Sequence, residues 1–370
     1  MADEPVGTPA LTFQPAPTPA WEVLQNLQQA QENDDQEDDD AGNDAMSIGH
    51  TGSDLDSALG SDLADSTYSL GSSILEYRIL HGRTYHSDIG TAQYWASNDE
   101  QASDSLDIAH HFTLLLLEDK LHLAHLRSDL QTRQKVLDIG TGTGIWAIDF
   151  ANEHPHVEVV ATEISPIQPS WVPSNLRLEI EDCNDEWTFN PDTFDFIHMR
   201  FMLGSITDWT ATLREAFTVC APGGWVESYE VSSTMESDDN SIPDGSAMQR
   251  WGQVFEEGGQ RAGRSFAIIQ EDVQKKSMEE AGFVNIHVKD LKAPVGGWHT
   301  EPRLKQVGQY MQAALERDYE GYLLFLACEL LGWTEDQVRV LCTQLRHEIR
   351  SRQHHPYFRQ RIVYGQKPEF

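Results

Sequence analysis

The segment from Gly140 to Gly144 reads Gly-Thr-Gly-Thr-Gly and follows directly on the short apolar run 136–139. Glycine adopts positive φ easily and lets a ligand approach the backbone closely. A helix that starts after such a turn directs its first unpaired N–H groups toward the same ligand. The segment therefore indicates a loop that binds a nucleotide-like ligand, although a turn that only joins a strand to a helix has the same pattern.

The spacing of the glycines separates two classes of ligand. A dinucleotide-binding turn has the pattern GxGxxG, and its third glycine would fall on Ile145 here. Asp138 lies just before the turn, where it would repel a pyrophosphate but suit a ligand with an ammonium and a sulfonium group. The spacing favours the cationic ligand. A nicotinamide-dependent oxidoreductase, which would bind NAD, is the alternative.

Two acidic residues follow later apolar runs. Glu163 comes 23 residues after Gly140, at the end of the run 157–162, and an acid near this distance accepts hydrogen bonds from both hydroxyls of a ribose. Asp182 follows the run 176–180 and is placed to accept from an adenine amino group. Exposed loop carboxylates are the alternative interpretation. Together with Asp138, these residues predict S-adenosylmethionine (SAM) as the cofactor.

Apolar runs alternate with amphipathic segments along the part of the chain that carries these residues. The expected strands are 136–139, 157–162, 176–180, 194–199, 225–231, 284–288 and 358–364, and the expected helices are 106–126, 145–152, 209–217, 271–281 and most of 302–352. Strands alternating with helices are typical of an α/β fold with a parallel, doubly wound sheet. Its ligand crevice lies at the carboxyl ends of the strands.

The N-terminal part of the chain has a different composition. Residues 1–70 contain 15 acidic residues and no Lys or Arg, and the whole chain has a formal charge of −34. The run 34–40 repels itself and offers nothing to bury, so we expect a disordered acidic tail over residues 1–74. One amphipathic stretch around Trp21 and Leu24 suggests a regulatory protein partner for the tail, and a transient helix is the alternative.

Composition also limits the partners. Both halves of the chain are acidic, so we expect no nucleic acid. Apolar runs such as Leu114–Leu117 are far shorter than the ~20 residues of a membrane helix, so we expect no membrane association. The four cysteines form no CxxC pair, which suggests reduced thiols in the cytoplasm, the nucleus or both. His122 and His125 lack a convincing third ligand, so we expect no metal.

Five motifs together carry a family resemblance. They are VLDIGTGTG at 136–144, Glu163 followed by 165–169, FDFIHMR at 194–200, the pair Asp208-Trp209, and PGGWVE at 222–227. As a set they resemble the fungal LaeA-like methyltransferases, which are class I SAM-dependent enzymes related to a global regulator of secondary metabolism. The resemblance extends over about residues 75–370.

The resemblance implies a Rossmann-like class I methyltransferase, with a seven-stranded, mostly parallel sheet and helices on both of its faces. It divides residues 75–370 into four parts: an N-terminal helical lid (75–134), a SAM-binding core (135–295), an inserted helical lid (299–353) and a last strand (356–367). By resemblance, Tyr85 and its neighbours close over SAM. Ser97 stands where the family usually has proline, and Ser105 where it has arginine.

The glycine loop, the acidic residues after the strands and the family resemblance together define the expected binding site. The expected cofactor-binding residues are Tyr85, Asp138, Gly140, Thr141, Gly142, Gly144, Glu163, Ile164, Asp182, Cys183 and Arg200. Tyr85, Trp146 and Trp187 are candidates for cation–π contact with the sulfonium, although Trp146 is more simply interpreted as core. Glu227 and Glu230 are interpreted as solvated edge residues or lid contacts.

The expected reaction needs little from the protein beyond positioning and a dry site. His198, at the end of a predicted strand, is the candidate catalytic residue, and a packed strand histidine is the equal alternative. The leading hypothesis is a SAM-dependent methyltransferase that acts on a small metabolite or a protein and is linked to fungal secondary metabolism. The second is a SAM-binding regulatory protein that works mainly through protein partners.

Overall fold

The computed structural model describes residues 75–87, 94–126 and 134–369. The predicted acidic tail lies outside these residues and stays a prediction. All four cysteines lie within them, and each is a free thiol. Within the described ranges, no helix is both long enough and apolar enough to cross a membrane.

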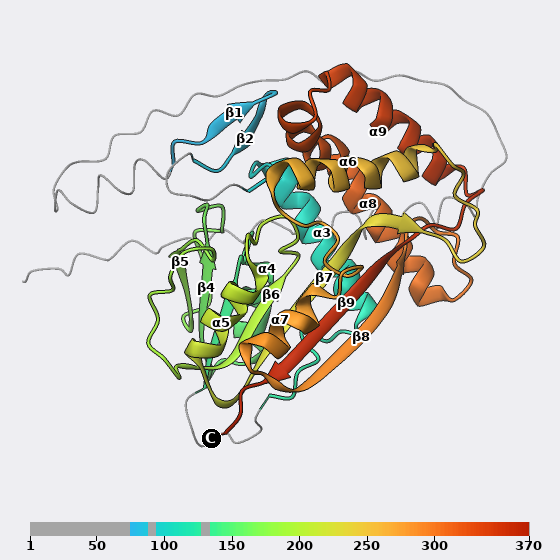
Figure 1. Cartoon of the computed structure of the whole chain (residues 1–370). Coiled ribbons are helices and arrows are strands. Elements are labelled where there is room, and N and C mark those ends of the chain that lie inside the picture. The colour runs from blue at the N-terminus through green and yellow to red at the C-terminus, as the bar shows by residue number, and fades with distance from the viewer. Residues whose placement is uncertain (1–74, 88–93, 127–133, 370) are drawn as a thin grey trace, which may run out of the picture. The chain divides into compact units, whose positions relative to one another are not determined.

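Seven strands form one sheet in the order β5-β4-β3-β6-β7-β9-β8 (Figure 1). The strands are β3 (Lys135–Ile139), β4 (Glu158–Glu163), β5 (Leu176–Ile180), β6 (Phe194–Arg200), β7 (Cys220–Glu236), β8 (Val284–Pro294) and β9 (Tyr357–Gln366). Strands β5 to β7 of this order pair in parallel, whereas β9 is antiparallel to both β7 and β8. The chain leaves β3 toward β4 and β5 and then returns to β6 on the other side. This reversal places the ligand crevice at the carboxyl ends of β3 and β6.

Helices cover both faces of the sheet. Helix α4 (Ile145–Glu153) packs on β4 and β5, while α5 (Trp209–Val219) and α7 (Val273–Ala281) pack on each other and on β7, β8 and β9. Val136 and Leu137 are neighbours on β3 and both are buried. Successive side chains of a strand point to opposite faces, so both faces must be covered. The predicted α/β fold with a seven-stranded, mostly parallel sheet is confirmed.

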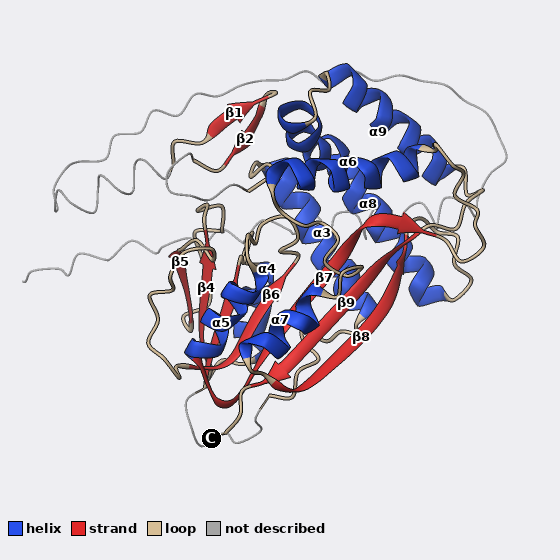
Figure 2. Cartoon of the chain, viewed as in Figure 1, coloured by secondary structure: helices blue, strands red, loops and turns tan. Residues whose placement is uncertain are grey.

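A second group of helices lies together in the upper part of Figure 2. It consists of α3 (Glu100–Leu116), α6 (Ala247–Ala262), α8 (Pro302–Leu324), the π-helical turn η1 (Phe325–Leu330) and α9 (Glu335–Arg350). Helix α8 packs against α3, α9 and β8, and α6 packs against α9 and β7. The expectation that most of 302–352 is helical is therefore confirmed.

The N-terminal segment differs from the helix expected over 106–126. Helix α3 begins six residues earlier, where the Asp99 side chain accepts a hydrogen bond from the Ala102 N–H, and it ends at Leu116. Glu118 and Asp119 then have positive φ. The leucines beyond this point still pack on the core, although their backbone is not helical: Leu121 is buried and its carbonyl accepts from the Trp146 indole. Apolar periodicity therefore continued past the end of the helix.

Helix α6 is an element that the sequence did not predict. It contains Gly252, Gly258 and Gly259, and glycine disfavours a helix interior. Close packing explains these glycines: a Cβ at Gly252 would lie 2.7 Å from Cγ2 of Thr234, and one at Gly259 would lie 2.6 Å from a backbone oxygen. Tertiary packing thus requires glycine at positions where helix propensity alone disfavours it.

Three further differences concern strands. Two short strands, β1 (Arg78–Leu80) and β2 (Arg83–Tyr85), form an antiparallel hairpin in a region that was expected to be helical. Strands β7 and β8 are longer than the expected 225–231 and 284–288. Both extensions pair with β9, and such pairing between distant segments is not visible in a local pattern.

Candidate active site

A cavity opens at the carboxyl ends of β3, β4, β5 and β6, as the parallel topology predicts. Residues of the strand ends and following loops line it: Asp138, Gly140, Thr141, Gly142, Thr143, Glu163, Ile164, Ser165, Glu181, Asp182, Cys183, Asn184, His198, Arg200, Phe201 and Met202. Tyr94, Ser97, Asn98, Ala102, Ser103 and Leu106 line it from the segment before α3 and from α3 itself. Ten of the predicted site residues are thereby brought to one cavity.

The glycine loop adopts a conformation that side chains tolerate poorly. Gly140, Gly142 and Gly144 have φ of 65°, 60° and 80°. Gly140 is also closely packed, because a Cβ there would lie 2.5 Å from Sδ of Met202. Gly144 is the N-cap of α4 and is not part of the cavity lining, so its role is to turn the chain into the helix.

The carboxylate of Glu163 connects the end of β4 with the glycine loop. Its Oε2 accepts from the Gly142 N–H at 3.0 Å, and its Oε1 accepts from the N–H groups of Ile164 and Ser165 at 2.8 and 3.3 Å. Burial, together with the nearby Asp138, raises its pKa, and the three N–H donors oppose this. A carboxylate has about four acceptor positions, so it can still accept from a ligand hydroxyl.

Two buried acceptor atoms in the cavity wall have no hydrogen-bond partner among the described residues. They are Oδ2 of Asp182 and Oδ1 of Asn98. The other oxygen of Asp182 accepts from the Asn184 backbone N–H and side-chain amide, both at 2.9 Å. A buried acceptor left without a donor costs about 1–3 kcal/mol. A ligand with N–H or O–H donors, such as an adenosine moiety, would remove this cost.

Asp138 and His198 form a buried pair at the floor of the cavity. His198 Nδ1 lies 2.7 Å from Asp138 Oδ1, and the Thr141 hydroxyl donates to Asp138 Oδ2 at 2.6 Å. The imidazole stacks on the Trp146 ring with centroids 3.8 Å apart. Burial lowers the pKa of His198. An ionised Asp138 only accepts, so Nδ1 of His198 is the donor. Trp146 is buried beneath the imidazole and also contributes to the cavity lining.

Arg200 brings a partly buried positive charge to the same cavity. Its Nη2 lies 3.1 Å from Nδ1 of His110, and Nε2 of His110 lies 2.9 Å from Asp149. Because arginine only donates, the proton of His110 sits on Nε2 and points to Asp149. Burial lowers the pKa of His110 to about 4. The imidazole is therefore neutral near pH 7 and adds no second positive charge beside Arg200.

Three predicted contacts do not reach the cavity. Tyr85 is fully buried beside Phe325, with ring centroids 5.8 Å apart, and the lining contains Tyr94 and Asn98 instead. Trp187 is also outside the lining, since its indole donates to the Cys183 carbonyl at 3.1 Å. Gly144 is the third. Asn98 was not among the predicted site residues, and tertiary contacts bring it to the cavity.

Of the two interpretations of Glu227 and Glu230, that of solvated edge residues is wrong, whereas Glu227 does contact the segment 75–134 that was expected to form the N-terminal lid. Both are buried, with 1% and 0% exposure. Glu227 accepts from two backbone N–H groups of the segment after α3, whereas Glu230 accepts from those of Met202 and Leu203 at 2.9 and 3.0 Å. Burial raises the pKa of Glu227 to about 7 and that of Glu230 to about 8. Glu230 thereby fixes the turn that carries Met202 into the cavity wall.

Comparisons with known proteins identify the family. A family model described as a methyltransferase domain matches residues 109–288. The methyltransferase pytC of Aspergillus terreus is 38% identical over 83% of this chain and 93% of its own length. The secondary metabolism regulator LAE1 of Cochliobolus heterostrophus is 30% identical over 78% of this chain and 94% of its own. The chain belongs to the LaeA-like methyltransferase family. It is a SAM-dependent methyltransferase linked to fungal secondary metabolism.

A solved structure with a similar course of the chain is phosphoethanolamine N-methyltransferase 2 of Haemonchus contortus in complex with SAM. The two are 16% identical, with a TM-score of 0.40, over 71% of this chain and 52% of the other. The unpaired acceptors of the cavity fit an adenosine moiety, and membership of the LaeA-like methyltransferase family identifies SAM as the cofactor. Within residues 75–87, 94–126 and 134–369, no three His, Cys, Asp or Glu residues are grouped as metal ligands.

Proposed function

We propose that the chain binds SAM in the cavity at the carboxyl ends of β3 to β6 and methylates a small metabolite or a protein there. The observation that carries the proposal is the set of buried acceptors, Glu163 and the unpaired oxygens of Asp182 and Asn98. SAM supplies an activated methyl group, so the protein mainly has to position the two reactants and exclude water.

The cavity residues suggest separate roles toward the cofactor. We assign the backbone of the loop from Gly140 to Gly142 to the methionine end and Glu163 to the ribose hydroxyls. The unpaired oxygen of Asp182 suits the adenine amino group. Arg200, a partly buried cation in the cavity lining, suits the carboxylate of the methionine end. Ile164 and Cys183 contribute wall surface next to Glu163 and Asp182.

His198 acts as a base only where the acceptor must lose a proton. Its Nδ1 donates to Asp138, so Nε2 carries the lone pair. One relative, from Emericella nidulans, is named a protein-methionine methyltransferase and is 29% identical over 84% of this chain. A thioether sulfur has no proton to lose, so such an acceptor needs no base. A methionine sulfur of a protein is therefore our second candidate acceptor.

Turnover separates an enzyme from a SAM-binding regulator. The full chain, incubated with SAM and fractions of a fungal extract, should form S-adenosylhomocysteine (SAH), and mass spectrometry should locate the methyl group on a metabolite or on a protein. The variant Glu163→Ala is the control and should form none. Tight SAM binding without SAH from any fraction would instead support a regulator that acts through partners, with the acidic segment 1–74 as the docking arm.

Microscopy of the tagged chain tests our proposal that it resides in the cytoplasm, the nucleus or both.

A further inference from the structure

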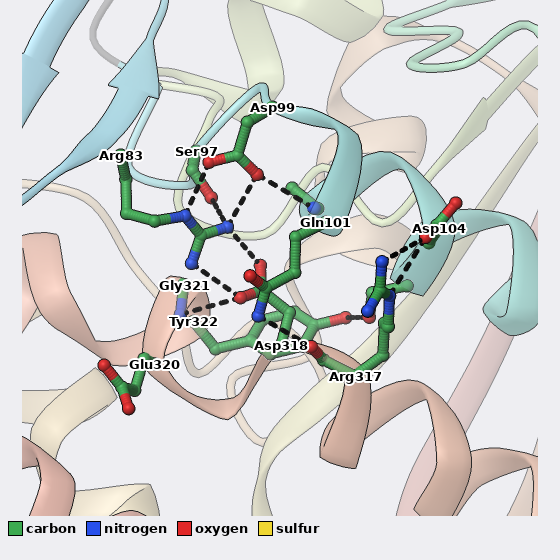
Figure 3. A network of polar contacts seen from close by, with 12 residues as sticks. Arg83, Ser97, Asp99, Gln101, Asp104, Arg317, Asp318, Glu320, Gly321 and Tyr322 are labelled. Atoms are coloured by element: carbon green, nitrogen blue, oxygen red, sulfur yellow. Dashed lines mark hydrogen bonds and ion pairs between the residues drawn. The ribbon is translucent and has the colours of Figure 1, made fainter. Parts of the chain in front are cut away.

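The side chain of Arg83, on β2, joins three separate segments of the chain (Figure 3). Its Nε and Nη2 donate to the two carboxylate oxygens of Asp99 at 2.5 and 2.7 Å. Its Nη1 and Nη2 donate to those of Asp318 at 2.7 and 3.0 Å, and Nη2 also donates to the Ser97 hydroxyl at 2.9 Å. The side chain of Arg83 is only 11% exposed, so these contacts form largely away from solvent.

Helix α8 is shaped to present Asp318 to this arginine. Asp318 has φ −146° and ψ 44°, which interrupts the helix, and its side chain folds back to accept from the Gly321 N–H at 3.1 Å. A Cβ at Gly321 would lie 2.0 Å from Oδ2 of Asp318, so only glycine leaves room for the folded side chain. The carboxylate is 4% exposed, and a buried carboxylate without its cation is strongly destabilising.

The other partners of Arg83 belong to the wall of the cofactor cavity. Asp99 caps α3 through the Ala102 N–H, and Ala102 lines the cavity. Ser97 and Asn98 line it as well. The Asn98 N–H donates to the Thr84 carbonyl, next to Arg83 in β2, at 2.9 Å. Arg83 thus contacts Ser97 and Asp99, the two neighbours of Asn98 in the chain, and the unpaired acceptor of Asn98 belongs to the cavity wall.

We propose that Arg83 is a positioning residue that couples α8 to the cofactor-facing wall, so that the affinity for SAM depends on the Arg83–Asp318 contact. Through Asp99 and Ser97, the guanidinium sets the position of Asn98 and of the first turn of α3. This proposal rests on the proposed placement of SAM in the cavity. The contact is a bidentate, planar pair that lysine cannot reproduce.

The test measures the affinity of the full chain for SAH by calorimetry. Arg83→Met and Asp318→Asn should each weaken binding by about tenfold, while the chain keeps a single cooperative thermal transition. The double variant should bind no more weakly than Arg83→Met alone, because Arg83→Met already removes the contact that Asp318→Asn breaks. Asp318→Asn keeps an acceptor for the Gly321 N–H and should therefore fold. If Arg83→Met does not fold, the SAH affinity of Asp318→Asn alone tests the proposal.

Arg317 provides a matched control. It also joins α8 to α3, through two donors to Asp104, but its side chain is 46% exposed and Asp104 does not line the cavity (Figure 3). Arg317→Met should therefore change SAH affinity by less than about twofold. Equal losses in Arg317→Met and Arg83→Met, or a lower melting temperature of Arg83→Met with unchanged SAH affinity, would overturn the proposal.

A further variant separates this inference from the proposed cofactor site. Glu163→Ala should lose SAH binding. Unchanged affinity in Glu163→Ala would mean that SAM binds elsewhere, and the placement itself would fail. Loss of binding in Glu163→Ala together with wild-type affinity in Arg83→Met and Asp318→Asn would leave the site intact and refute the role of Arg83.

Discussion

The backbone N–H of Gly142 donates to Oε2 of Glu163 over 3.0 Å, which joins the glycine loop after β3 to the end of β4. The same carboxylate has capacity left for a ligand. One side chain therefore shapes the loop and lines the cavity that we propose for the cofactor. Substitutions at Glu163 should affect binding more strongly than a loss of one ligand contact alone would suggest.

Replacing Glu163 with Gln should weaken SAH binding by about 10- to 100-fold, because hydrogen bonds to a charged group contribute about 1.5–3 kcal/mol. Calorimetry of SAH binding checks this. Glu158→Gln is the matched control, since Glu158 lies at the other end of β4 and pairs with Lys135 at 3.4 Å on the partly exposed side. Comparable losses of affinity in the two variants would contradict a specific role of Glu163.

Gly140→Ala should separate binding from stability. A non-glycine residue at φ 65° costs about 1–2 kcal/mol. The added methyl group would also displace the end of the Met202 side chain within the cavity, so SAH affinity should fall by at least about tenfold. Gly332→Ala, at φ 74° with no atom within 4 Å of its Cβ, should lose similar stability and keep its affinity. Urea unfolding and calorimetry on both variants give the comparison.

Glu230→Gln tests the anchoring of the turn after β6. The carboxylate accepts from two backbone N–H groups, whereas a Gln amide offers a single oxygen, so one buried N–H loses its acceptor. We expect a loss of about 1–3 kcal/mol in the free energy of unfolding, measured with urea. The exposed Glu279, paired only with Lys275 along α7, is the control, and Glu279→Gln should lose less than about 0.5 kcal/mol. An unchanged free energy of unfolding in Glu230→Gln would show that the turn after β6 does not depend on this carboxylate.

His81 should make the stability of the chain depend on pH. Its two ring nitrogens lie 3.0 and 2.8 Å from carboxylate oxygens of Glu335 and Glu329, and these contacts raise its pKa against the opposing effect of burial. The folded state thus holds the proton more tightly than the unfolded state, whose pKa is about 6.5. The stabilisation is complete below that value and is lost as pH rises through the higher pKa of the folded state.

This pH dependence is measured by comparing the melting temperatures of wild type and His81→Asn from below about pH 6.5 to above the raised pKa of His81. Asn tolerates the positive φ of this position, so the variant adds little backbone strain. The wild type should melt higher at low pH, and the difference should shrink as pH rises. Glu335→Gln should flatten the same dependence. A difference that does not change with pH would mean that protonation of His81 contributes nothing.

Much of the core fold followed from local pattern. Strands β3 to β6 and helices α4, α5 and α7 lie where alternating apolar runs and amphipathic segments placed them. The buried strands of a parallel sheet are continuous apolar runs, so their limits are visible along the chain. Elements stabilised by distant partners were less visible: the β1–β2 hairpin, glycine-rich α6, and the extensions of β7 and β8 along β9.

The sequence by itself identified the glycine loop and the acidic residues that line the candidate cavity. Gly140, Asp138, Glu163 and Asp182 stand at the ends of consecutive parallel strands, and such ends meet at one edge of a sheet. Their residue types and spacing were therefore enough to predict that they lie close together and that the cofactor is SAM.

Only the tertiary structure decided which other side chains face the cavity and what supports them. It placed Asn98 rather than Tyr85 in the wall, buried Glu230 under the turn after β6, and joined Arg83 to Asp318 across 235 residues. These relationships depend on how helices pack over the sheet. Packing joins residues that are far apart in the chain, and no local periodicity or spacing encodes it.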